Sequence, residues 1–285
     1  MTLDSSYAHC AGVARKQAKN FYYSFLLLSK PQRQAMCAIY AFMRYCDDLS
    51  DDESIHDRVG AIERWRGDLD SALAGVPPDH PIWPAFIDTV RRYRIPHEYF
   101  FDMIDGVSSD LDPRRVQTFQ ELYDYCYHVA SVVGLTIIHI FGFESPEALK
   151  LAEKCGIAFQ LTNILRDVRE DSEKKRVYLP AEDFRRFGVS AETFEPHEDF
   201  LAMMEFEACR ARDYYYQSLP LVALIDVRSR ASLRALIGIY ARLLDRIVAS
   251  DYDVLERRIR LPLWEKILVL VKARIPWSEI GPRPQ

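Results

Sequence analysis

The sequence of 285 residues predicts an all-α, single-domain protein with a large apolar core. Apolar residues recur mostly at three- and four-residue spacing, and no alternating run bounded by turn signals indicates a sheet. Hydrophobic residues make up 49% of the chain and charged residues 28%, which is enough apolar material for one core. Breaks at 75–84, 105–115 and 179–199 have the character of connections between helices. We therefore expect one helical domain over residues 1–285.

The composition excludes several classes of protein. A net charge of −5 does not supply the basic face that nucleic-acid binding requires. The six cysteines form no C-x-x-C pair and lie mostly in apolar segments, which is typical of reduced thiols in the cytoplasm. The N-terminus "MTLDSSYAHC" has no basic region followed by an apolar one, as a signal peptide would. We expect a cytoplasmic protein with no nucleic-acid partner.

Two apolar stretches bear on membrane contact. They are "VVGLTIIHIFGF" (132–143) and "ILVLV" (267–271), and both fall short of the roughly 18 to 20 residues that span a bilayer. We expect no transmembrane segment, and peripheral contact with the inner face of the membrane stays open.

A helix is expected to begin near residue 30 and to end in carboxylates. In "SKPQ", Ser29 can cap the helix with Gln32 as its capping-box partner. At about 100° per residue, the apolar face runs through Tyr40 and continues to Asp47 and Asp51. Negative charge at a helix C-terminus opposes the macrodipole, which favours a bound cation over a solvated helix end.

The stretch "YCYHVASVVG" (125–134) places two small residues, Ala130 and Gly134, four apart on one helix face. A glycine inside a helix costs about 1 kcal/mol relative to alanine. Space for a ligand tail and close helix packing both explain the pair, and the sequence leaves the two explanations open.

The stretch "CGIAFQLTNILRDVREDSEKKRVYLP" (155–180) repeats the acidic arrangement far away in the chain. Gln160, Asn163, Asp167 and Asp171 share one stripe that borders the apolar face of a helix. Two i, i+4 carboxylate pairs on separate core helices would repel each other strongly without cations. Oxygen ligands without His or Cys favour Mg²⁺, which often shares its shell with substrate phosphates.

Basic residues accompany both acidic pairs. Guanidinium and ammonium groups beside a magnesium site suit a diphosphate, because they neutralise the oxygens that the metal leaves free. They are Arg44 near the first pair and Arg166, Lys174, Lys175 and Arg176 near the second.

Together, "YAFMRYCDDLSDD" and "QLTNILRDVREDSEKKRVYLP" resemble the two aspartate-rich signatures of the squalene and phytoene synthase family. The resemblance covers nearly the whole chain, and "FYYSFLLL" with "YDVLERRIRLP" most resembles the bacterial presqualene diphosphate synthase branch. It implies the isoprenoid synthase fold, in which aspartate pairs on facing helices bind Mg²⁺ at the mouth of a deep, central apolar cavity.

The resemblance also implies individual roles. The metal ligands would be Asp47, Asp51, Asn163, Asp167 and Asp171. The catalytic group would comprise Tyr40, Arg44, Asp47, Asp51, Asp167, Asp171 and Tyr240. Substrate would be bound by Phe21, Tyr22, Phe25, Ala130, Gly134, Gln160, Asn163, Arg166, Arg176, Tyr178 and Arg257.

The implied reaction is the head-to-head (1'-1) condensation of two allylic prenyl diphosphates. We expect two farnesyl diphosphates to give presqualene diphosphate for triterpenoid and hopanoid synthesis, with NADPH needed only if the reaction continues to squalene. The alternative is a phytoene synthase that condenses two geranylgeranyl diphosphates for carotenoid synthesis. Head-to-tail prenyl elongation, terpene cyclisation and a silent protein that binds cations or lipids fit the motifs less well.

Overall fold

The computed structural model describes residues 1–18, 21–52, 54–111, 115–190 and 195–275. Within these ranges the chain forms helices and no strand beyond an isolated bridge between Phe143 and Ile225, so the all-α prediction is confirmed. The helices are α1 (Leu3–Gln17), α2 (Phe21–Phe25), α3 (Lys30–Asp51), α4 (Arg58–Leu73), α5 (Trp83–Tyr93), α6 (Glu98–Ser109), α7 (Phe119–Cys126), η1 (Tyr127–Ser131), α8 (Val132–Phe141), α9 (Glu147–Glu173), α10 (Ala181–Phe187), α11 (Glu198–Ser218), α12 (Leu221–Leu224), α13 (Arg230–Ala249) and α14 (Leu263–Ala273).

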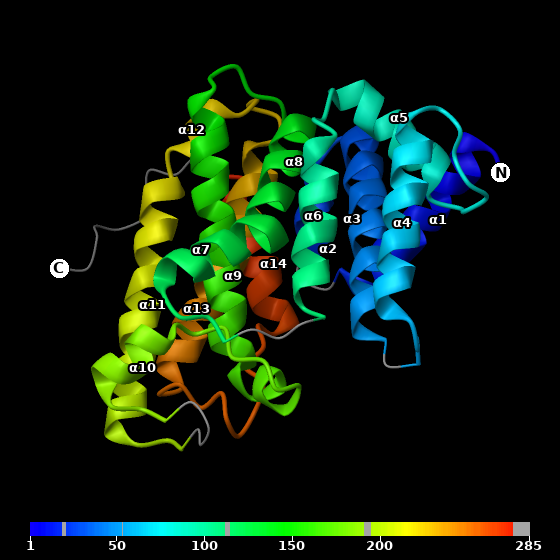
Figure 1. Ribbon diagram of the computed structural model, residues 1–285. Helices are drawn as coiled ribbons and strands as arrows, with labels where there is room; N and C mark the ends of the chain where they lie inside the picture. Colours follow the sequence, from blue (N-terminus) through cyan, green and yellow to red (C-terminus); the bar gives the residue numbers. More distant parts are fainter. Residues whose placement is uncertain (19–20, 53, 112–114, 191–194, 276–285) are drawn as a thin grey trace.

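Helix α9 runs through the middle of the bundle, where it packs against α11, η1, α8 and α13. On the other side α3 packs against α1, α4 and α5. The C-terminal ends of α3, α6 and α9 all lie at the lower end of the molecule (Figure 1). This arrangement brings the two acidic stretches of the sequence to one end of the fold.

Helix α3 begins at Lys30, as predicted, with Pro31 in its first turn. The capping box itself does not form. The Ser29 hydroxyl donates to Oε1 of Gln32 at 2.8 Å, while the Gln32 amide donates to the backbone oxygen of Ile140 at 3.1 Å and to Ser229 Oγ at 2.9 Å. Gln32 therefore ties the start of α3 to α8 and α13.

The segments α7, η1 and α8 form one continuous helix with a π-turn, the five-residue repeat of η1, in its middle. Such wide turns often mark functional sites. Neighbouring glycines make room for it: a Cβ on Gly156 of α9 would lie 2.5 Å from the Cα of Ser131, and one on Gly106 of α6 would lie 2.9 Å from the carbonyl carbon of His128. The π-turn is thus clamped between α6 and α9.

By length and composition alone this continuous helix, Phe119–Phe141, could cross a membrane, and 56% of its apolar window is buried inside the protein. This helix is longer than the apolar stretch 132–143 noted in the sequence, because it also includes the more polar α7. In this fold it serves as a core helix.

We expect Gly156→Ala to lower the free energy of unfolding by about 1–3 kcal/mol, because the new methyl group would overlap backbone atoms of the π-turn. Gly67→Ala is the matched control, since its methyl group would meet nothing within 4 Å and should raise helix stability by up to about 1 kcal/mol. Urea unfolding of both variants measures the difference. Equal effects would contradict the proposed clamp.

Candidate active site

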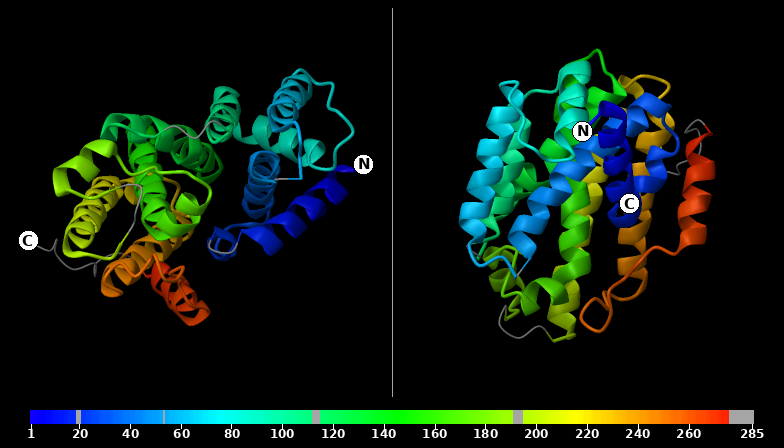
Figure 2. Two further views of the ribbon diagram at one scale, coloured as in Figure 1. Left: turned by 60° about the horizontal axis from the view of Figure 1, so that its bottom comes forward. Right: turned by 90° about the vertical axis from the view of Figure 1, so that its right-hand side faces the viewer.

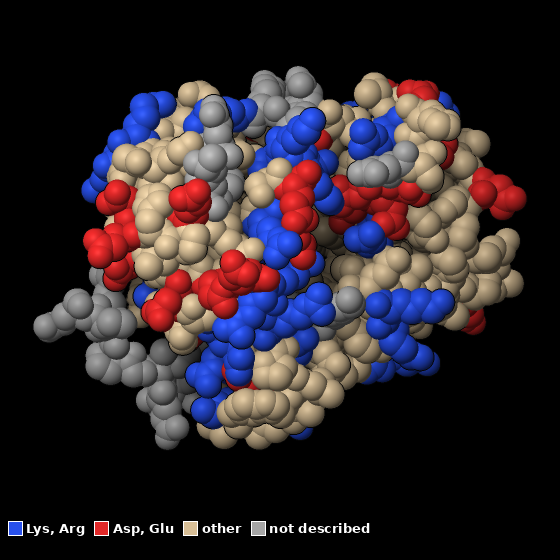
Figure 3. Space-filling model, turned by 90° about the horizontal axis from the view of Figure 1, so that it is seen from below, with Lys and Arg blue, Asp and Glu red and all other residues tan. Residues whose placement is uncertain are grey.

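A cavity of about 670 Å³ opens at the lower end of the bundle and extends between α3, α6, η1, α8, α9 and α13. Its deep wall is apolar, and charged side chains gather at its mouth. In the view from below, acidic and basic groups surround a central hollow (Figure 3). Representative wall residues are Met103, Val133, Ile137, Phe159, Leu236 and Leu243. The expected central apolar cavity is present.

The first acidic pair sits on the last turns of α3. Asp47 is half-buried and lines the cavity, whereas Asp51 is exposed one turn further on. Burial raises the pKa of Asp47 to about 7, and the neighbouring Asp51 and Asp48 carboxylates add to this against the opposing charge of Arg44. Arg44 lines the cavity and forms an ion pair with Asp48.

The second acidic pair sits on the last turns of α9. Asp167 accepts from Nε of Arg166 at 2.8 Å and lies 3.1 Å from Nε of Arg258. Burial raises the pKa of Asp171 to about 7, with the Asp167 carboxylate as the next cause. Each acidic pair therefore includes one carboxylate whose charge the protein alone compensates poorly.

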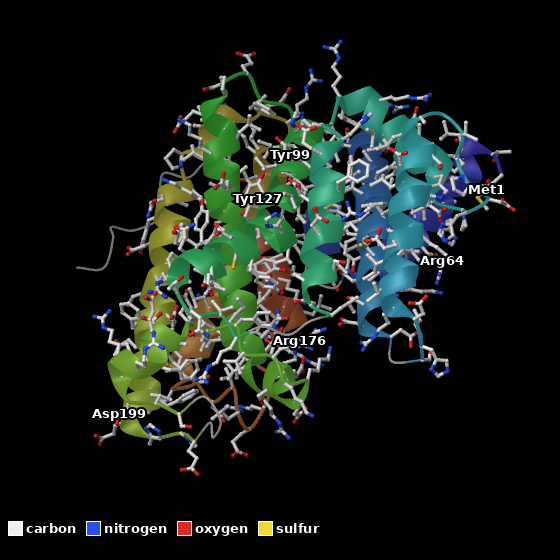
Figure 4. All side chains as sticks on the ribbon, viewed as in Figure 1. Met1, Arg64, Tyr99, Tyr127, Arg176 and Asp199 are labelled. Atoms are coloured by element: carbon white, nitrogen blue, oxygen red, sulfur yellow. The ribbon has the colours of Figure 1, made fainter. Side chains whose placement is uncertain are left out.

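Contacts between the two stretches bring the acidic pairs together. Asp51 Oδ1 lies 3.4 Å from Nη1 of Arg176 and 3.7 Å from Nζ of Lys174, both of which follow the second pair in the sequence. Arg176 lies at the lower end of the bundle (Figure 4). The predicted association of the two motifs is present in the fold.

The donors at this mouth fit a hard divalent cation. They are carboxylates with an amide oxygen, and Oδ1 of Asn163, which lines the cavity, is buried without a hydrogen-bond partner. Across the described ranges, no three Asp, Glu, His or Cys side chains converge closely enough to hold an ion. Lysine and arginine side chains contact the carboxylates instead, so ion binding would require these cations to move aside.

Aromatic side chains line the cavity beside the acidic mouth. Phe21 lies 5.5 Å from Tyr240 between ring centroids, and Tyr240 stacks on Phe159 at 4.4 Å. Burial raises the pKa of both Tyr40 and Tyr240 to about 12, so both hydroxyls are protonated at neutral pH.

Of the other predicted site residues, one group lines the cavity and another lies outside it. Ala130, Gly134, Gln160 and Arg166 line the cavity. Gly134 serves both ligand space and close helix packing, because it lines the cavity and a Cβ there would also lie 3.1 Å from the backbone oxygen of Ala152 on α9.

Two of the predicted aromatics lie outside the cavity wall. Phe25 is buried in the core, and its ring contacts Tyr22 edge-on. The Tyr22 hydroxyl accepts from Nε of Arg15 at 3.4 Å. Because α2 is a single short helix, only Phe21 of this trio faces the cavity.

Arg257 also lies away from the cavity. It is exposed and pairs with Asp253 at 2.8 Å, while the adjacent Arg258 lines the cavity and contacts Asp167 and Glu170. The segment "LERRIRLP" is not helical, so helical periodicity could not indicate which arginine points inward. The cavity-lining arginine of this segment is therefore Arg258 and not the predicted Arg257.

Sequence reasoning missed Asp110, which follows α6 and lines the cavity. Its carboxylate accepts from the Tyr178 hydroxyl at 2.8 Å and from the Tyr125 hydroxyl at 3.4 Å, and its backbone oxygen accepts from Arg176 at 3.1 Å. Burial raises the pKa of Asp110. No i+4 carboxylate accompanies it, so the sequence carries no signal comparable to the paired motifs.

The raised pKa values predict a loss of stability with rising pH in metal-free protein. The folded state holds the Asp171 proton more tightly than the unfolded chain, whose pKa is near 3.8, so stability falls as pH rises from about 4 to 7. Asp171→Asn should therefore raise the free energy of unfolding at pH 8 by about 1–3 kcal/mol, after discounting for partial exposure.

Urea unfolding in EDTA tests this prediction, and the gain should nearly vanish at pH 4.5. Asp70→Asn on the exposed face of α4 is the matched control and should change little at either pH. A pH-independent effect of Asp171→Asn would refute the electrostatic explanation.

Comparisons with known proteins agree with this geometry. The family model for squalene/phytoene synthase matches residues 14–265. The chain is 34% identical to 15-cis-phytoene synthase of Synechococcus elongatus, over 96% of this chain and 94% of that protein. It is 35% identical to phytoene synthase of Mycobacterium tuberculosis, over 98% and 94%.

Solved structures share the fold. A dehydrosqualene synthase superposes with a TM-score of 0.89 at 30% identity, covering 95% of this chain and 96% of that one. A squalene synthase from Alicyclobacillus acidocaldarius superposes with a TM-score of 0.82 at 25% identity, covering 88% and 95%. The isoprenoid synthase fold is therefore confirmed.

The relatives overturn the expected substrate. The sequence resemblance favoured farnesyl diphosphate and presqualene diphosphate, whereas the curated relatives are named phytoene synthases, including a chloroplastic one from Arabidopsis thaliana that is 35% identical over 94% of this chain and 66% of that protein. The expectation was wrong because the two segments behind it form only a small part of the cavity wall. The chain belongs to the squalene/phytoene synthase family, whose members are prenyltransferases that act on prenyl diphosphates.

Proposed function

We propose that this protein condenses two geranylgeranyl diphosphates head to head into phytoene. The observation that carries the proposal is the meeting of two acidic pairs at the mouth of a long apolar cavity, in a chain whose curated relatives are named phytoene synthases. The reaction needs no reductant, so NADPH, expected only for a squalene-forming step, has no part in it.

Mg²⁺ is the proposed cofactor, held by Asp47, Asp51, Asp167 and Asp171 with the amide oxygen of Asn163. Bound there, it would act as a Lewis acid that neutralises the diphosphate and assists its departure. The oxygen-only donors, the raised pKa values of Asp47 and Asp171 and the unpartnered Asn163 oxygen support this assignment.

The arginines around the mouth have a second role in this proposal. Arg44, Arg166, Arg176 and Arg258 contact Asp side chains in the free protein. Once cations occupy the carboxylates, the guanidinium groups can turn to the diphosphate oxygens, whose geometry they match with paired hydrogen bonds. The carboxylates would thus be paired with arginines in the free protein and with metal ions when substrate is bound.

The apolar wall would protect the cationic stage of the reaction from water. Loss of diphosphate from one substrate leaves an allylic cation, which the double bond of the second substrate attacks before a proton leaves and a cyclopropane closes. Loss of the second diphosphate from this C40 intermediate, rearrangement of the resulting cation and loss of a second proton then give phytoene. The faces of Phe21, Phe159 and Tyr240 can stabilise such a cation. With the pKa of Tyr40 and Tyr240 near 12, the released diphosphate is the more suitable proton acceptor.

The proposed setting is the cytoplasm, where prenyl diphosphates are the partners. Five of the six cysteines are buried, and all six are unpaired, which fits a reducing compartment.

Incubation of the purified protein with Mg²⁺ and C20 or C15 prenyl diphosphate, with and without NADPH, should give a C40 phytoene from the C20 substrate alone. Mass analysis of the lipid extract identifies the product. A C30 product made in preference to the C40 one would overturn the substrate, and the absence of any condensation product would overturn the function. Asp47→Ala and Asp171→Ala should each reduce turnover by about a thousandfold or more while circular dichroism stays unchanged.

The neighbouring arginines provide a second test. Arg258→Ala should lower kcat/KM by about tenfold to a hundredfold, because it removes a cation from the mouth. Arg257→Ala should stay within about twofold of the parent, since Arg257 is exposed and, among the residues that the structure describes, its one ion pair is with Asp253. A larger loss at Arg257 would contradict the assignment of Arg258.

A further inference from the structure

Helix α14 presents an apolar face to the outside of the molecule. Leu263, Trp264, Ile267, Leu268 and Val271 follow helical spacing and share this face. Trp264 is 61% exposed and Val271 54%. Both views of Figure 2 show α14 at the periphery of the bundle, and no helix of the described ranges packs over this face.

The inward side of α14 carries Glu265 together with the half-buried Val269 and the buried Ala273. Glu265 is only 2% exposed, and its carboxylate accepts from Nε of Arg242 at 3.0 Å and from Nε of Arg246 at 2.8 Å. These ion pairs with α13 fix the rotation of α14 about its axis. The outward orientation of the apolar residues is therefore built into the fold and is not a consequence of loose packing.

The surroundings of this face are basic. Arg260, Lys272 and Arg274 are exposed, and Glu265, the one acidic residue between positions 258 and 275, is buried and paired. At the lower edge of Figure 3, an uncharged patch lies between lysine and arginine side chains. This charge pattern is complementary to a negatively charged surface.

The size of the patch distinguishes between partners. The five exposed fractions correspond to roughly 500 Å² if a fully exposed side chain of this size offers about 200 Å². A stable protein interface buries about 800 Å² on each partner, so this face is small for a dimer of the chain. An interfacial helix needs only one apolar face with basic flanks.

The face is also continuous with the cavity. Ile259, Leu261 and Lys266 line the cavity, and Lys266 lies between Trp264 and Ile267 on the same helix. We propose that α14 inserts its apolar face into the surface of an anionic lipid bilayer, with its basic neighbours on the lipid headgroups. The cavity lip would then lie next to the membrane. This inference does not depend on the proposed reaction.

Sedimentation of the full chain with phosphatidylcholine vesicles, with and without about 30% phosphatidylglycerol, tests the proposal without any substrate. The protein should bind the anionic vesicles, and added salt should weaken the binding. The triple variant Trp264→Ser, Ile267→Ser, Val271→Ser should bind about tenfold or more weakly. Because these side chains are exposed, circular dichroism and thermal unfolding should match the parent.

The double variant Val59→Ser, Val76→Ser is the control, since both valines are at least as exposed as the α14 residues but lie on or just after α4. It should bind as the parent does. Failure of the parent to bind anionic vesicles, or equal binding by the triple variant, would overturn the proposal. So would a dimer in sedimentation velocity that the triple variant disrupts, because a second copy would then cover the face.

Discussion

Repulsion between carboxylates at the mouth of an apolar cavity is the constraint on which this structure depends. Asp47 and Asp171 come from helices far apart in sequence, and both have a pKa near 7 because burial and neighbouring acids disfavour their charge. A fold that only had to be stable would separate such groups. Here the ion pairs of Asp51 with Arg176 and Lys174 join the two motifs, and Gly106 and Gly156 let α6 and α9 pack closely against the π-turn, which forms part of the cavity wall.

Lysine and arginine side chains around the mouth compensate part of the carboxylate charge in the free protein. Arg176 and Lys174 contact Asp51, and Arg166 and Arg258 contact Asp167, so basic residues of the second motif and of the segment after α13 pair with both acidic motifs. The pair of Lys174 with Asp51 is exposed and therefore weak, whereas the pair of Arg166 with Asp167 is largely buried. Under the proposed function, the exposed pairs would be exchanged for metal ions and diphosphate at the lowest cost, as a site that binds and releases charged substrates requires.

The sequence predicted the features that rest on helical periodicity. The all-α class and the stripe of each carboxylate pair follow from spacing within single helices, the start of α3 follows from "SKPQ", and the meeting of the two pairs is what the family resemblance implied. Features outside helices escaped prediction: Asp110 ends α6 without a partner motif, and Arg258 rather than Arg257 faces the cavity in a segment without regular structure. Substrate length was also mispredicted, since the two segments that indicated the presqualene branch contribute only Phe21 and residues 258–261 to the cavity wall.

Helix α14 shows a further limit of periodicity, because an amphipathic pattern identifies two faces without indicating which is buried. The usual assumption places the apolar face inward, yet two arginines of α13 hold Glu265 inside, and the apolar face points out. A buried carboxylate is costly to leave unpaired, and the two guanidinium partners of Glu265 lie on α13, so this side of α14 stays turned toward the protein. Under the proposal above, the apolar surface left outside contacts a lipid bilayer. The cavity lip then lies next to that bilayer, where an apolar product would leave the enzyme.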